Sequence, residues 1–323
     1  MSPNKILIVN QNWLGDVLFS TPAIRAIRKK FPASYIACLV PPRCETVLKR
    51  NPHLNKIILC GDRVNLFSPD FWGAVRRIRA GRFDQVVFFH RSKTKAWMTR
   101  LAGIPARLDY EPLAGRVHKI DHFLNLLSRF SIPADGRALD FCPDPAAETR
   151  LQDLLSESGL SLGAAYVVVH AGGNWGLKRW PAKYFAEWIR LFRKKFPWKV
   201  ILCGTDSERK ICDEIVSVFP NGEAFSLCGR TSLDVLALLL KNARFLLSND
   251  SGPIHLAASQ RTKIIGLFGP TDPALTGPVS DAPLRILRKD VGCEVPCYFR
   301  SCDDHACMNS LTPEEVFHEA QSF

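Results

Sequence analysis

The segment between residues 243 and 268 constrains the fold more than any other part of the chain. An apolar run at 243–247 leads into the polar turn SNDSG at 248–252, and a short helical stretch then precedes a second apolar run at 263–268. This order predicts a strand, a tight turn, a helix and a strand, which is the repeating unit of a parallel sheet. The turn directs backbone N–H groups to the helix N-terminus, where phosphate binds readily, and Asp250 stands where a carboxylate binds a pair of ribose hydroxyls. The segment therefore predicts a nucleotide-linked substrate.

The start of the chain has the same pattern. A β-branched run at 6–10 is followed by a polar turn and then by helical periodicity at 17–30, so Asp16 lies between a strand and a helix. Open parallel sheets bind ligands at the carboxyl ends of their strands, and this turn places Asp16 there. Two interpretations follow: Asp16 caps the helix by accepting its free N–H groups, or it acts as a general base.

Strands and helices alternate in two series. The first has predicted strands at 5–10, 34–40, 56–60 and 85–89 and helices at 17–30, 43–49, 71–80 and 93–101. The second has predicted strands at 166–170, 199–203, 224–228, 244–248 and 263–268 and helices at 181–196, 207–219, 232–242 and 253–259. This alternation predicts an α/β protein made of two doubly wound domains with a cleft between them. The composition changes at 131–163, so we predict one domain at 1–155, a second at 160–311, and a last helix at 312–323 that begins with a capping box.

Composition and charge exclude several classes of protein. The chain has 323 residues, 46% of them hydrophobic and 23% charged, which is typical of a globular protein with two domains. No apolar run reaches the roughly 18 residues that span a bilayer, and the N-terminus runs directly into a strand, so we predict neither a membrane span nor a signal peptide. The net charge of +12 suits nucleic acid, an anionic membrane surface or an acidic substrate. No nucleic-acid-binding motif and no Lys/Arg tail is present, so nucleic acid is the disfavoured partner.

The eleven cysteines fall into two groups. Seven lie in or beside apolar segments and are predicted to be buried thiols in a reducing cytosol. The other four, Cys293, Cys297, Cys302 and Cys307, lie close together with His305 among them. They lack the paired Cys-x2-Cys spacing of common zinc sites, so zinc, free thiols and disulfides all remain open. We predict no catalytic metal, and these four are the weak candidate set for a structural one.

Residues 170–181 form a glycine-rich loop after a predicted strand. Its glycines allow a ligand to approach the backbone, and Lys178 can bring a positive charge to a phosphate. The alternative is a flexible, solvated loop, because the Gly-x-Gly-x-x-Gly dinucleotide fingerprint is absent.

Two further positions have both a structural and a functional interpretation. The loop at 204–208 can bind sugar hydroxyls through a carboxylate, or Asp206 or Ser207 can simply cap the next helix. His255 lies one turn into the helix that follows the SNDSG turn, where it is either a packing residue or a phosphate contact.

Together these motifs resemble those of the ADP-heptose:lipopolysaccharide heptosyltransferases, glycosyltransferase family 9. The resemblance covers nearly the whole chain in order. Its motifs are LGDV at 14–17 with TPA at 21–23, KRWP at 178–181, SNDSG at 248–252 with His255, FGPTDP at 268–273, and a heptosyltransferase II-like ending from CMN at 307–309 to TPE at 312–314.

The resemblance implies a fold and a substrate class. The family has the GT-B fold, in which two Rossmann-like domains bind the acceptor on the N-terminal side and the donor on the C-terminal side, and the last helix packs back toward the N-terminal domain. The implied donor is ADP-heptose, no cofactor is required, and the implied acceptor is a lipid-linked anionic saccharide. The protein is then expected in the cytoplasm, in peripheral contact with the inner face of the cytoplasmic membrane and without nucleic acid as a partner.

The resemblance also assigns residues. Asp16 is implied as the general base of an inverting, metal-independent transfer, and Lys178 as a catalytic contact to the donor phosphate. The other implied donor contacts are Gly173, Asn174, Glu208, Asp250, Ser251, Gly252 and His255, and the expected acceptor contacts are Asn12, Trp13 and Arg91. Gly173 and Asn174 stand where the family often has a pair of threonines. The alternatives are a GT-B glycosyltransferase or epimerase that uses another nucleotide sugar, or a non-catalytic nucleotide-sugar-binding protein.

Overall fold

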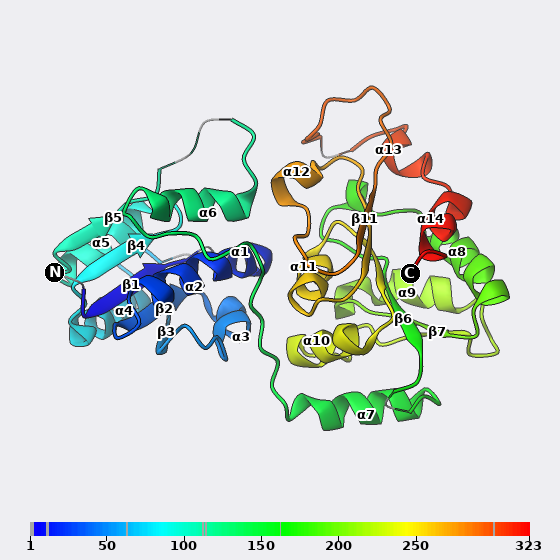
Figure 1. Ribbon diagram of the computed structural model, residues 1–323, viewed down its shortest axis with the longest axis horizontal. Coiled ribbons are helices and arrows are strands. Elements are labelled where there is room, and N and C mark those ends of the chain that lie inside the picture. Colours follow the sequence, from blue (N-terminus) through cyan, green and yellow to red (C-terminus); the bar gives the residue numbers. More distant parts are fainter. Residues whose placement is uncertain are drawn as a thin grey trace. The chain divides into compact units, whose positions relative to one another are not determined.

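The computed structural model of the protein describes residues 3–10, 13–62, 64–111, 113, 115–161, 163–299 and 301–323. The chain divides into two compact units, Met1–Cys142 and Pro143–Phe323 (Figure 1). Helix α7 (Ala147–Glu157) packs on helix α10 (Leu233–Asn242) and so is part of the second unit. The first unit therefore ends earlier than the 1–155 expected from the sequence.

The described residues of the first unit form a five-stranded parallel sheet in the order β3-β2-β1-β4-β5. The strands are β1 (Lys5–Val9), β2 (Tyr35–Val40), β3 (Lys56–Leu59), β4 (Gln85–Phe88) and β5 (Ala106–Leu108). The helices are α1 (Leu14–Phe19), α2 (Thr21–Lys30), the 3-10 helix η1 (Pro42–Cys44), α3 (Glu45–Leu48), α4 (Pro69–Gly81), α5 (Lys93–Leu101) and α6 (Lys119–Ser128). The direction of winding reverses between β1 and β4, which is where open sheets of this kind bind ligands.

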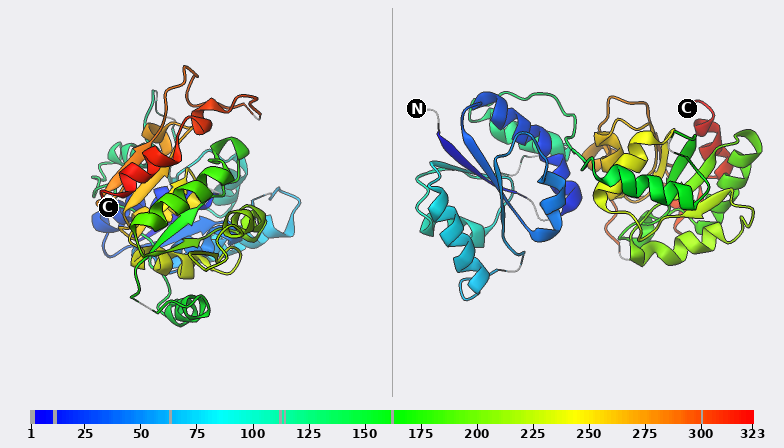
Figure 2. Two further views of the ribbon diagram at one scale, coloured as in Figure 1. Left: turned by 90° about the vertical axis from the view of Figure 1, so that its right-hand side faces the viewer. Right: turned by 90° about the horizontal axis from the view of Figure 1, so that it is seen from below.

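Helices α4 and α5 cover one face of this sheet, and Figure 2 shows helices on both of its faces. Helix α4 turns an apolar side toward the strands, consisting of Phe71, Ala74, Val75 and Ile78. From α5, Met98 and Ala102 join the same core. The opposite sides of both helices face solvent.

The helix predicted at 17–30 is two helices that meet at Ser20. Pro22 has no N–H group, so it cannot donate to the carbonyl of Leu18, and a continuous helix is interrupted at this point. The hydroxyl of Thr21 donates to that carbonyl instead, at 2.8 Å. This break keeps α1 as a separate short helix after β1.

The described residues of the second unit form a six-stranded parallel sheet in the order β11-β10-β9-β6-β7-β8. The strands are β6 (Tyr166–His170), β7 (Lys199–Leu202), β8 (Ala224–Ser226), β9 (Leu246–Asn249), β10 (Ile264–Leu267) and β11 (Leu284–Leu287). Besides α7 and α10, the helices are η2 (Gly176–Lys178), α8 (Ala182–Lys195), η3 (Asp206–Glu208), α9 (Arg209–Val216), α11 (Gly252–Ser259), α12 (Pro273–Thr276), α13 (Ala306–Asn309) and α14 (Pro313–Ala320).

The last helix, α14, packs against α8 and β10. Its side chains Val316 and Ala320 are buried in the core of the second unit, in the same cluster as Trp188. Thr312 and Glu315 form the predicted capping box at its start. The apolar side of this helix is thus used within the second unit, whereas the sequence led us to expect that residues 312–323 pack toward the first domain.

Besides the short helices η2, α12 and α13, the sequence did not indicate β5, β11 or α6. Strands β5 and β11 are short, and α6 begins at Lys119 with His118 as its N-cap, whose ring nitrogen accepts the N–H of Ile120 at 3.2 Å. Histidine is not among the residues that usually cap a helix, so the start of α6 has no recognisable sequence signal.

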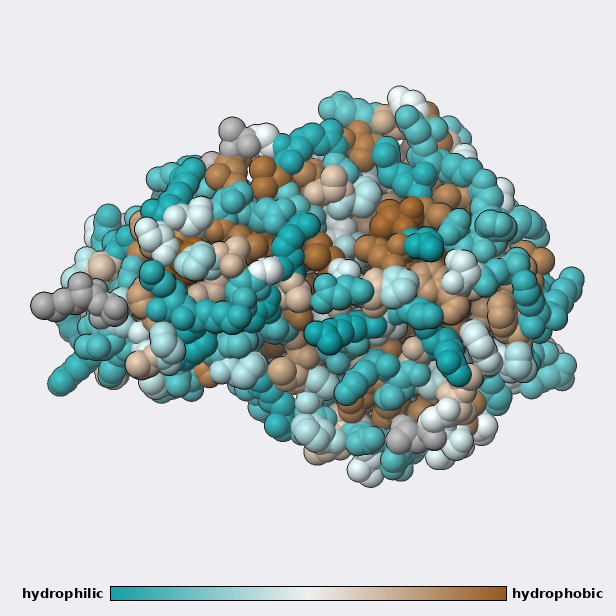
Figure 3. Space-filling model, in the orientation of Figure 1, coloured by the Kyte–Doolittle hydropathy of each residue, from teal (hydrophilic) through white to brown (hydrophobic). Residues whose placement is uncertain are grey.

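The surface charge is divided unevenly along the chain. Residues 1–142 contain 23 Lys and Arg residues against 10 Asp and Glu residues, whereas residues 143–323 contain 20 against 21. The excess positive charge therefore belongs to the first unit. On the face drawn in Figure 3, hydrophilic residues surround separate groups of apolar ones. Within the described parts of the chain, no helix is long and apolar enough to cross a membrane.

Candidate active site

The second sheet reverses its winding between β6 and β9. From β6 the chain adds β7 and β8 on one side, and β9, β10 and β11 follow on the other. The loops after β6 and β9 therefore diverge at the carboxyl edge of the sheet, which is the usual ligand position in open α/β sheets. These loops carry Lys178 and Asp250, and the loop after β7 carries Glu208. The three predicted side chains thus lie along one edge.

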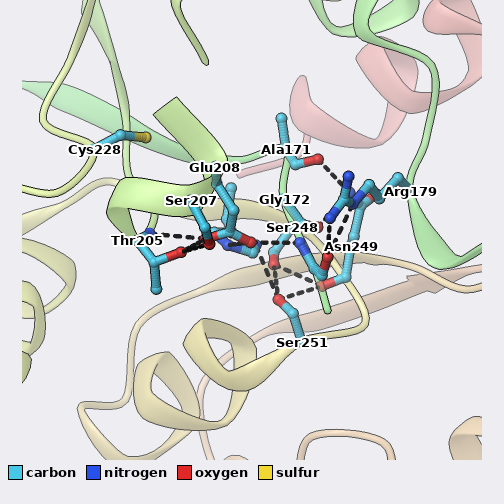
Figure 4. A network of polar contacts seen from close by, with 12 residues as sticks. Ala171, Gly172, Arg179, Thr205, Ser207, Glu208, Cys228, Ser248, Asn249 and Ser251 are labelled. Carbon is cyan, nitrogen blue, oxygen red and sulfur yellow. Dashed lines mark hydrogen bonds and ion pairs between the residues drawn. The ribbon is translucent and has the colours of Figure 1, made fainter. Parts of the chain in front are cut away.

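Asn249, the last residue of β9, fastens the glycine-rich loop to the sheet. Its buried amide donates to the carbonyls of Ala171 at 2.9 Å and Gly172 at 3.0 Å, as Figure 4 shows. Its side-chain carbonyl oxygen accepts the backbone N–H of Trp180 at 3.1 Å, and the Trp180 indole donates to the carbonyl of Leu311 at 2.8 Å. Both ends of the loop are held by buried groups, which favours the functional interpretation over a flexible, solvated loop.

Lys178 and Asp250 form an ion pair at this edge. The Lys178 Nζ lies 2.7 Å from Asp250 Oδ2, and the hydroxyl of Thr271 donates to the same oxygen at 2.7 Å. The Asp250 side chain is 4% exposed and that of Lys178 is 20% exposed. An ammonium group has three N–H donors, so the buried carboxylate orients Lys178 and leaves other donors for a ligand.

Glu208 is held by groups from two loops. Its Oε1 accepts the N–H of Gly173 at 2.5 Å and lies 3.4 Å from His170 Nε2, and its Oε2 accepts the N–H of Thr205 at 2.7 Å. Burial alone would raise the pKa of Glu208, but the hydrogen bond and charge of His170, together with the Thr205 N–H, lower this pKa well below its usual range. Glu208 is therefore an ionised carboxylate at neutral pH.

The glycines of the loop make room for this carboxylate. A Cβ atom on Gly172 would lie 2.0 Å from Glu208 Oε1, so any side chain there would displace the carboxylate from its hydrogen bonds. Gly173 has a φ of 143°, a conformation that side chains rarely adopt. Asn174, the next residue, is exposed.

The loop after β7 corrects one expectation. Thr205 is the N-cap of η3, and Glu208 closes a capping box with it. Neither Asp206 nor Ser207 caps the helix, because both lie within η3 rather than at the residue that precedes it.

The N-terminus of α11 faces open space. Ser251 is its N-cap residue, with its hydroxyl 2.9 Å from His170 Nδ1, and a Cβ atom on Gly252 would have no neighbour within 4 Å. Pro253 in the first turn needs no partner for an N–H group. The free N–H groups of such a helix end bind anions. His255 follows one turn later and is buried.

In the first unit, Asp16 follows the first strand, β1, as Lys178 follows β6 in the second unit. Helix α1 begins at Leu14 with Trp13 as its N-cap, so Asp16 stands within the first turn and the N-cap interpretation is wrong. Its Oδ1 lies 2.9 Å from the Nζ of Lys119, at the start of α6. Lys119 was not predicted as a site residue, because the helix that carries it was not recognised.

The expected acceptor residues are only partly described. Trp13 is 65% exposed, and the Arg43 guanidinium lies 4.7 Å from the centre of its ring. Arg91 follows β4 and is exposed, whereas Asn12 lies outside the described residues. Asp16, Trp13 and Arg91 therefore come from the loops after β1 and β4, the two strands between which the first sheet reverses its winding.

The four C-terminal cysteines come together without forming a metal site. Cys293, Cys297, Cys302 and Cys307 line a cavity of about 50 Å³ with His305, and all four are free thiols. Burial and the neighbouring cysteines raise the pKa of Cys307. Among the residues that the structure describes, no group of three or more His, Cys, Asp or Glu side chains is arranged to hold a metal ion.

The cysteine segment, residues 293–307, also contacts the loop that carries Lys178. His305 Nε2 lies 2.7 Å from the carbonyl oxygen of Leu177, directly before Lys178. The N–H of Cys297 donates to the carbonyl of Pro270 at 2.7 Å, next to Thr271. The cysteine segment thus contacts both loops that hold the Lys178–Asp250 pair.

Comparison with known proteins identifies the family of the chain. The family model of glycosyltransferase family 9 (heptosyltransferase) matches residues 72–298. The chain belongs to this family. It is 25% identical over 325 residues to lipooligosaccharide heptosyltransferase 2 of Campylobacter jejuni, with 98% of each chain covered. The structure of E. coli ADP-heptose LPS heptosyltransferase II superimposes with a TM-score of 0.80 at 21% identity and 98% coverage of both chains.

A second E. coli structure has the same fold. Heptosyltransferase WaaC with ADP has a TM-score of 0.74 at 19% identity, covering 98% of this chain and 99% of that one. These similarities confirm the GT-B fold of two parallel-sheet domains and the assignment of the protein as a glycosyltransferase.

Proposed function

We propose that the protein transfers heptose from ADP-L-glycero-D-manno-heptose to an acceptor heptose or Kdo in the inner core of lipopolysaccharide. Membership of family 9 and the full-length similarity to heptosyltransferases 2 support this substrate class. The observation that carries the proposal is the Lys178–Asp250 pair at the carboxyl edge of the second sheet, beside the open N-terminus of α11. This combination suits the diphosphate of a nucleotide sugar.

The second unit supplies the donor site in this proposal. Lys178 and the N–H groups at Ser251 and Gly252 bind the diphosphate and stabilise the negative charge that grows on it as the sugar departs. Asp250 keeps Lys178 in position, and Glu208 provides the carboxylate for hydroxyl groups of the nucleoside or sugar. Because these groups supply positive charge to the leaving diphosphate, the proposal needs no metal ion.

The first unit supplies the base. Asp16 accepts the proton of the acceptor hydroxyl, and the oxygen attacks the anomeric carbon as the bond from that carbon to the diphosphate breaks. A single displacement of this kind inverts the configuration and releases ADP. Lys119 holds one carboxylate oxygen of Asp16, and we assign the proton transfer to the other oxygen. Asn12, Trp13 and Arg91 are the proposed acceptor contacts.

The acceptor is proposed to be lipid-linked and anionic. The excess of basic residues in the first unit supports this choice, because core saccharides of this class carry phosphate and carboxylate groups. Such an acceptor places the enzyme in peripheral contact with the inner face of the cytoplasmic membrane.

The test is a mass-spectrometric transfer assay with ADP-heptose and two acceptors, Kdo-lipid A and its mono-heptosylated form. We expect a mass gain of one heptose on one of them, and its loss in Asp16→Asn, which keeps the shape of the side chain. Asp109→Asn, at an exposed acid of the same unit, is the matched control and should transfer normally. Full activity of Asp16→Asn would remove Asp16 as the base. Binding of ADP without transfer to either acceptor would point instead to another sugar, an epimerase or a binding protein.

A further inference from the structure

Helices α4 and α5 present large aromatic side chains to solvent. The two helices pack against each other over one face of the first sheet. Trp72 on α4 is 46% exposed and Trp97 on α5 is 54% exposed. Scattered apolar residues are normal on a protein surface, but two tryptophans on adjacent helices suggest a shared role.

The turn that precedes α4 adds two more apolar side chains. Leu66 and Phe67 are 47% and 95% exposed. The turn is nevertheless well ordered by hydrogen bonds: the N–H of Ser68 donates to the carbonyl of Asn65 at 3.0 Å, and the indole of Trp72 donates to the carbonyl of Leu66 at 2.8 Å. Hydrogen bonds within the turn thus hold its backbone, while the side chain of Phe67 is exposed to water.

Basic side chains flank these aromatic ones. Arg76 follows Trp72 by one helical turn and is exposed, as is Arg100, whose guanidinium lies 5.9 Å from the centre of the Trp97 ring. Within α4 and α5, whose residues are all described, Asp70 is the single acidic residue. We call this region the α4–α5 surface, defined by Leu66, Phe67, Trp72, Arg76, Trp97 and Arg100.

We propose that the α4–α5 surface docks on an anionic lipid bilayer. Tryptophan and phenylalanine rings are favoured at the interface between headgroups and acyl chains, while Arg side chains lay their apolar stems on that interface and pair with anionic headgroups. The charge of the first unit is complementary to such a surface, with 23 basic residues against 10 acidic ones. A nucleic acid would account for the basic groups but not for Leu66 and Phe67 at the tip of the turn.

This inference extends the proposed function, because a lipid-linked acceptor lies in a bilayer of this kind. The side chains that it assigns to the bilayer are different from those proposed to act on the donor and the acceptor. Its primary test needs no turnover, so failure of the proposed transfer leaves the measurement intact.

The test is flotation of the full-length protein with vesicles. One set contains phosphatidylethanolamine with phosphatidylglycerol, and the other contains phosphatidylcholine alone. We expect binding to the anionic vesicles, and about a tenfold weaker binding for the double variant Leu66→Ser/Phe67→Ser, since it loses two inserted side chains. Arg76→Glu/Arg100→Glu should weaken binding similarly and reduce its dependence on salt. Phe130→Ser, at an exposed phenylalanine after α6, is the matched control and should bind as wild type.

A second readout separates docking from catalysis. The Leu66→Ser/Phe67→Ser variant should transfer sugar normally to a water-soluble, deacylated acceptor and slowly to the same acceptor embedded in vesicles. The proposal is overturned if wild-type protein does not float with anionic vesicles, or if the double variant binds them as tightly as Phe130→Ser. It is equally overturned if the double variant instead converts a dimeric wild-type protein into a monomer, because the surface would then be an interface between copies of the chain.

Discussion

Replacing Glu208 by glutamine tests whether one partly buried carboxylate, 10% exposed, joins the loops of the donor side. The carboxylate accepts N–H groups from Gly173 and Thr205 and lies beside His170. Glutamine has the same shape, but it carries no charge and turns an NH2 group toward one of these donors. A hydrogen bond to a charged group contributes about 1.5–3 kcal/mol, and an unpaired buried N–H costs about 1–3 kcal/mol. We therefore expect Glu208→Gln to lower the free energy of unfolding of the second unit by about 2–4 kcal/mol.

The pH dependence gives this prediction a sharper form. The pKa of Glu208 is lower in the folded protein than in the unfolded chain, where it is about 4.3. Its stabilising contribution is thus complete above the unfolded pKa and is lost as the pH falls through that value toward the folded pKa. The difference between wild type and Glu208→Gln should be constant at about pH 6–8 and should shrink below about pH 4.

The measurement is urea unfolding followed by tryptophan fluorescence, with hydrogen exchange of peptides from 166–181 to locate the effect in the second unit. Glu187→Gln, at an exposed position on α8, is the matched control and should unfold as wild type. Equal midpoints for wild type and Glu208→Gln at neutral pH would refute the structural role of the carboxylate. If the stability difference between wild type and Glu208→Gln stayed the same below about pH 4, the charge of Glu208 would be refuted as its cause.

Three further predictions concern the same loops. Lys178→Met should lower kcat/KM for the donor by about a hundredfold in steady-state kinetics, because it removes the cation beside the diphosphate. Lys183→Met is the control and should stay active, and equal activity of the two variants would refute the role of Lys178. Gly172→Ala should destabilise the second unit by about 1–3 kcal/mol in thermal unfolding, because its methyl group overlaps Glu208, whereas Gly176→Ala, with nothing within 4 Å, should not. His305→Ala should raise the Kd of ADP a few-fold in calorimetry by releasing the loop before Lys178, and an unchanged Kd would show that this contact does not position the loop.

The repeating fold was predictable because each strand and helix has a local signal. Strand β6 was predicted with its observed ends, since alanine and glycine, which are poor strand formers, flank its β-branched run on both sides. Helix α14 was also predictable, because Thr312, Pro313 and Glu315 give its start a complete cap. In contrast, α6 has a histidine cap and β5 is three residues long with an arginine in the middle, so neither has a pattern that differs from a loop.

The sequence indicated single residues of the candidate site but not which residues pair with one another. Lys178, Glu208 and Asp250 were each recognisable from the motif that carries them. Their partners come from elsewhere in the chain: Lys178 lies 72 positions from Asp250, and Gly173 lies 35 positions from Glu208. Such pairs depend on strand order, which sequence periodicity does not contain.

Strand order also explains why the units place their polar residues in the same way. In each sheet the winding reverses beside the first strand of the unit, between β1 and β4 in one and between β6 and β9 in the other. The first helix after that strand carries Asp16 in the first unit (α1) and Lys178 in the second (η2). Each is then met by a charged partner of opposite sign from a later part of its own unit, Lys119 and Asp250 respectively. A charged partner fixes the orientation of a side chain that is otherwise mobile in water, so each parallel sheet positions one charged group, the Asp16 carboxylate or the Lys178 ammonium, by the same topology.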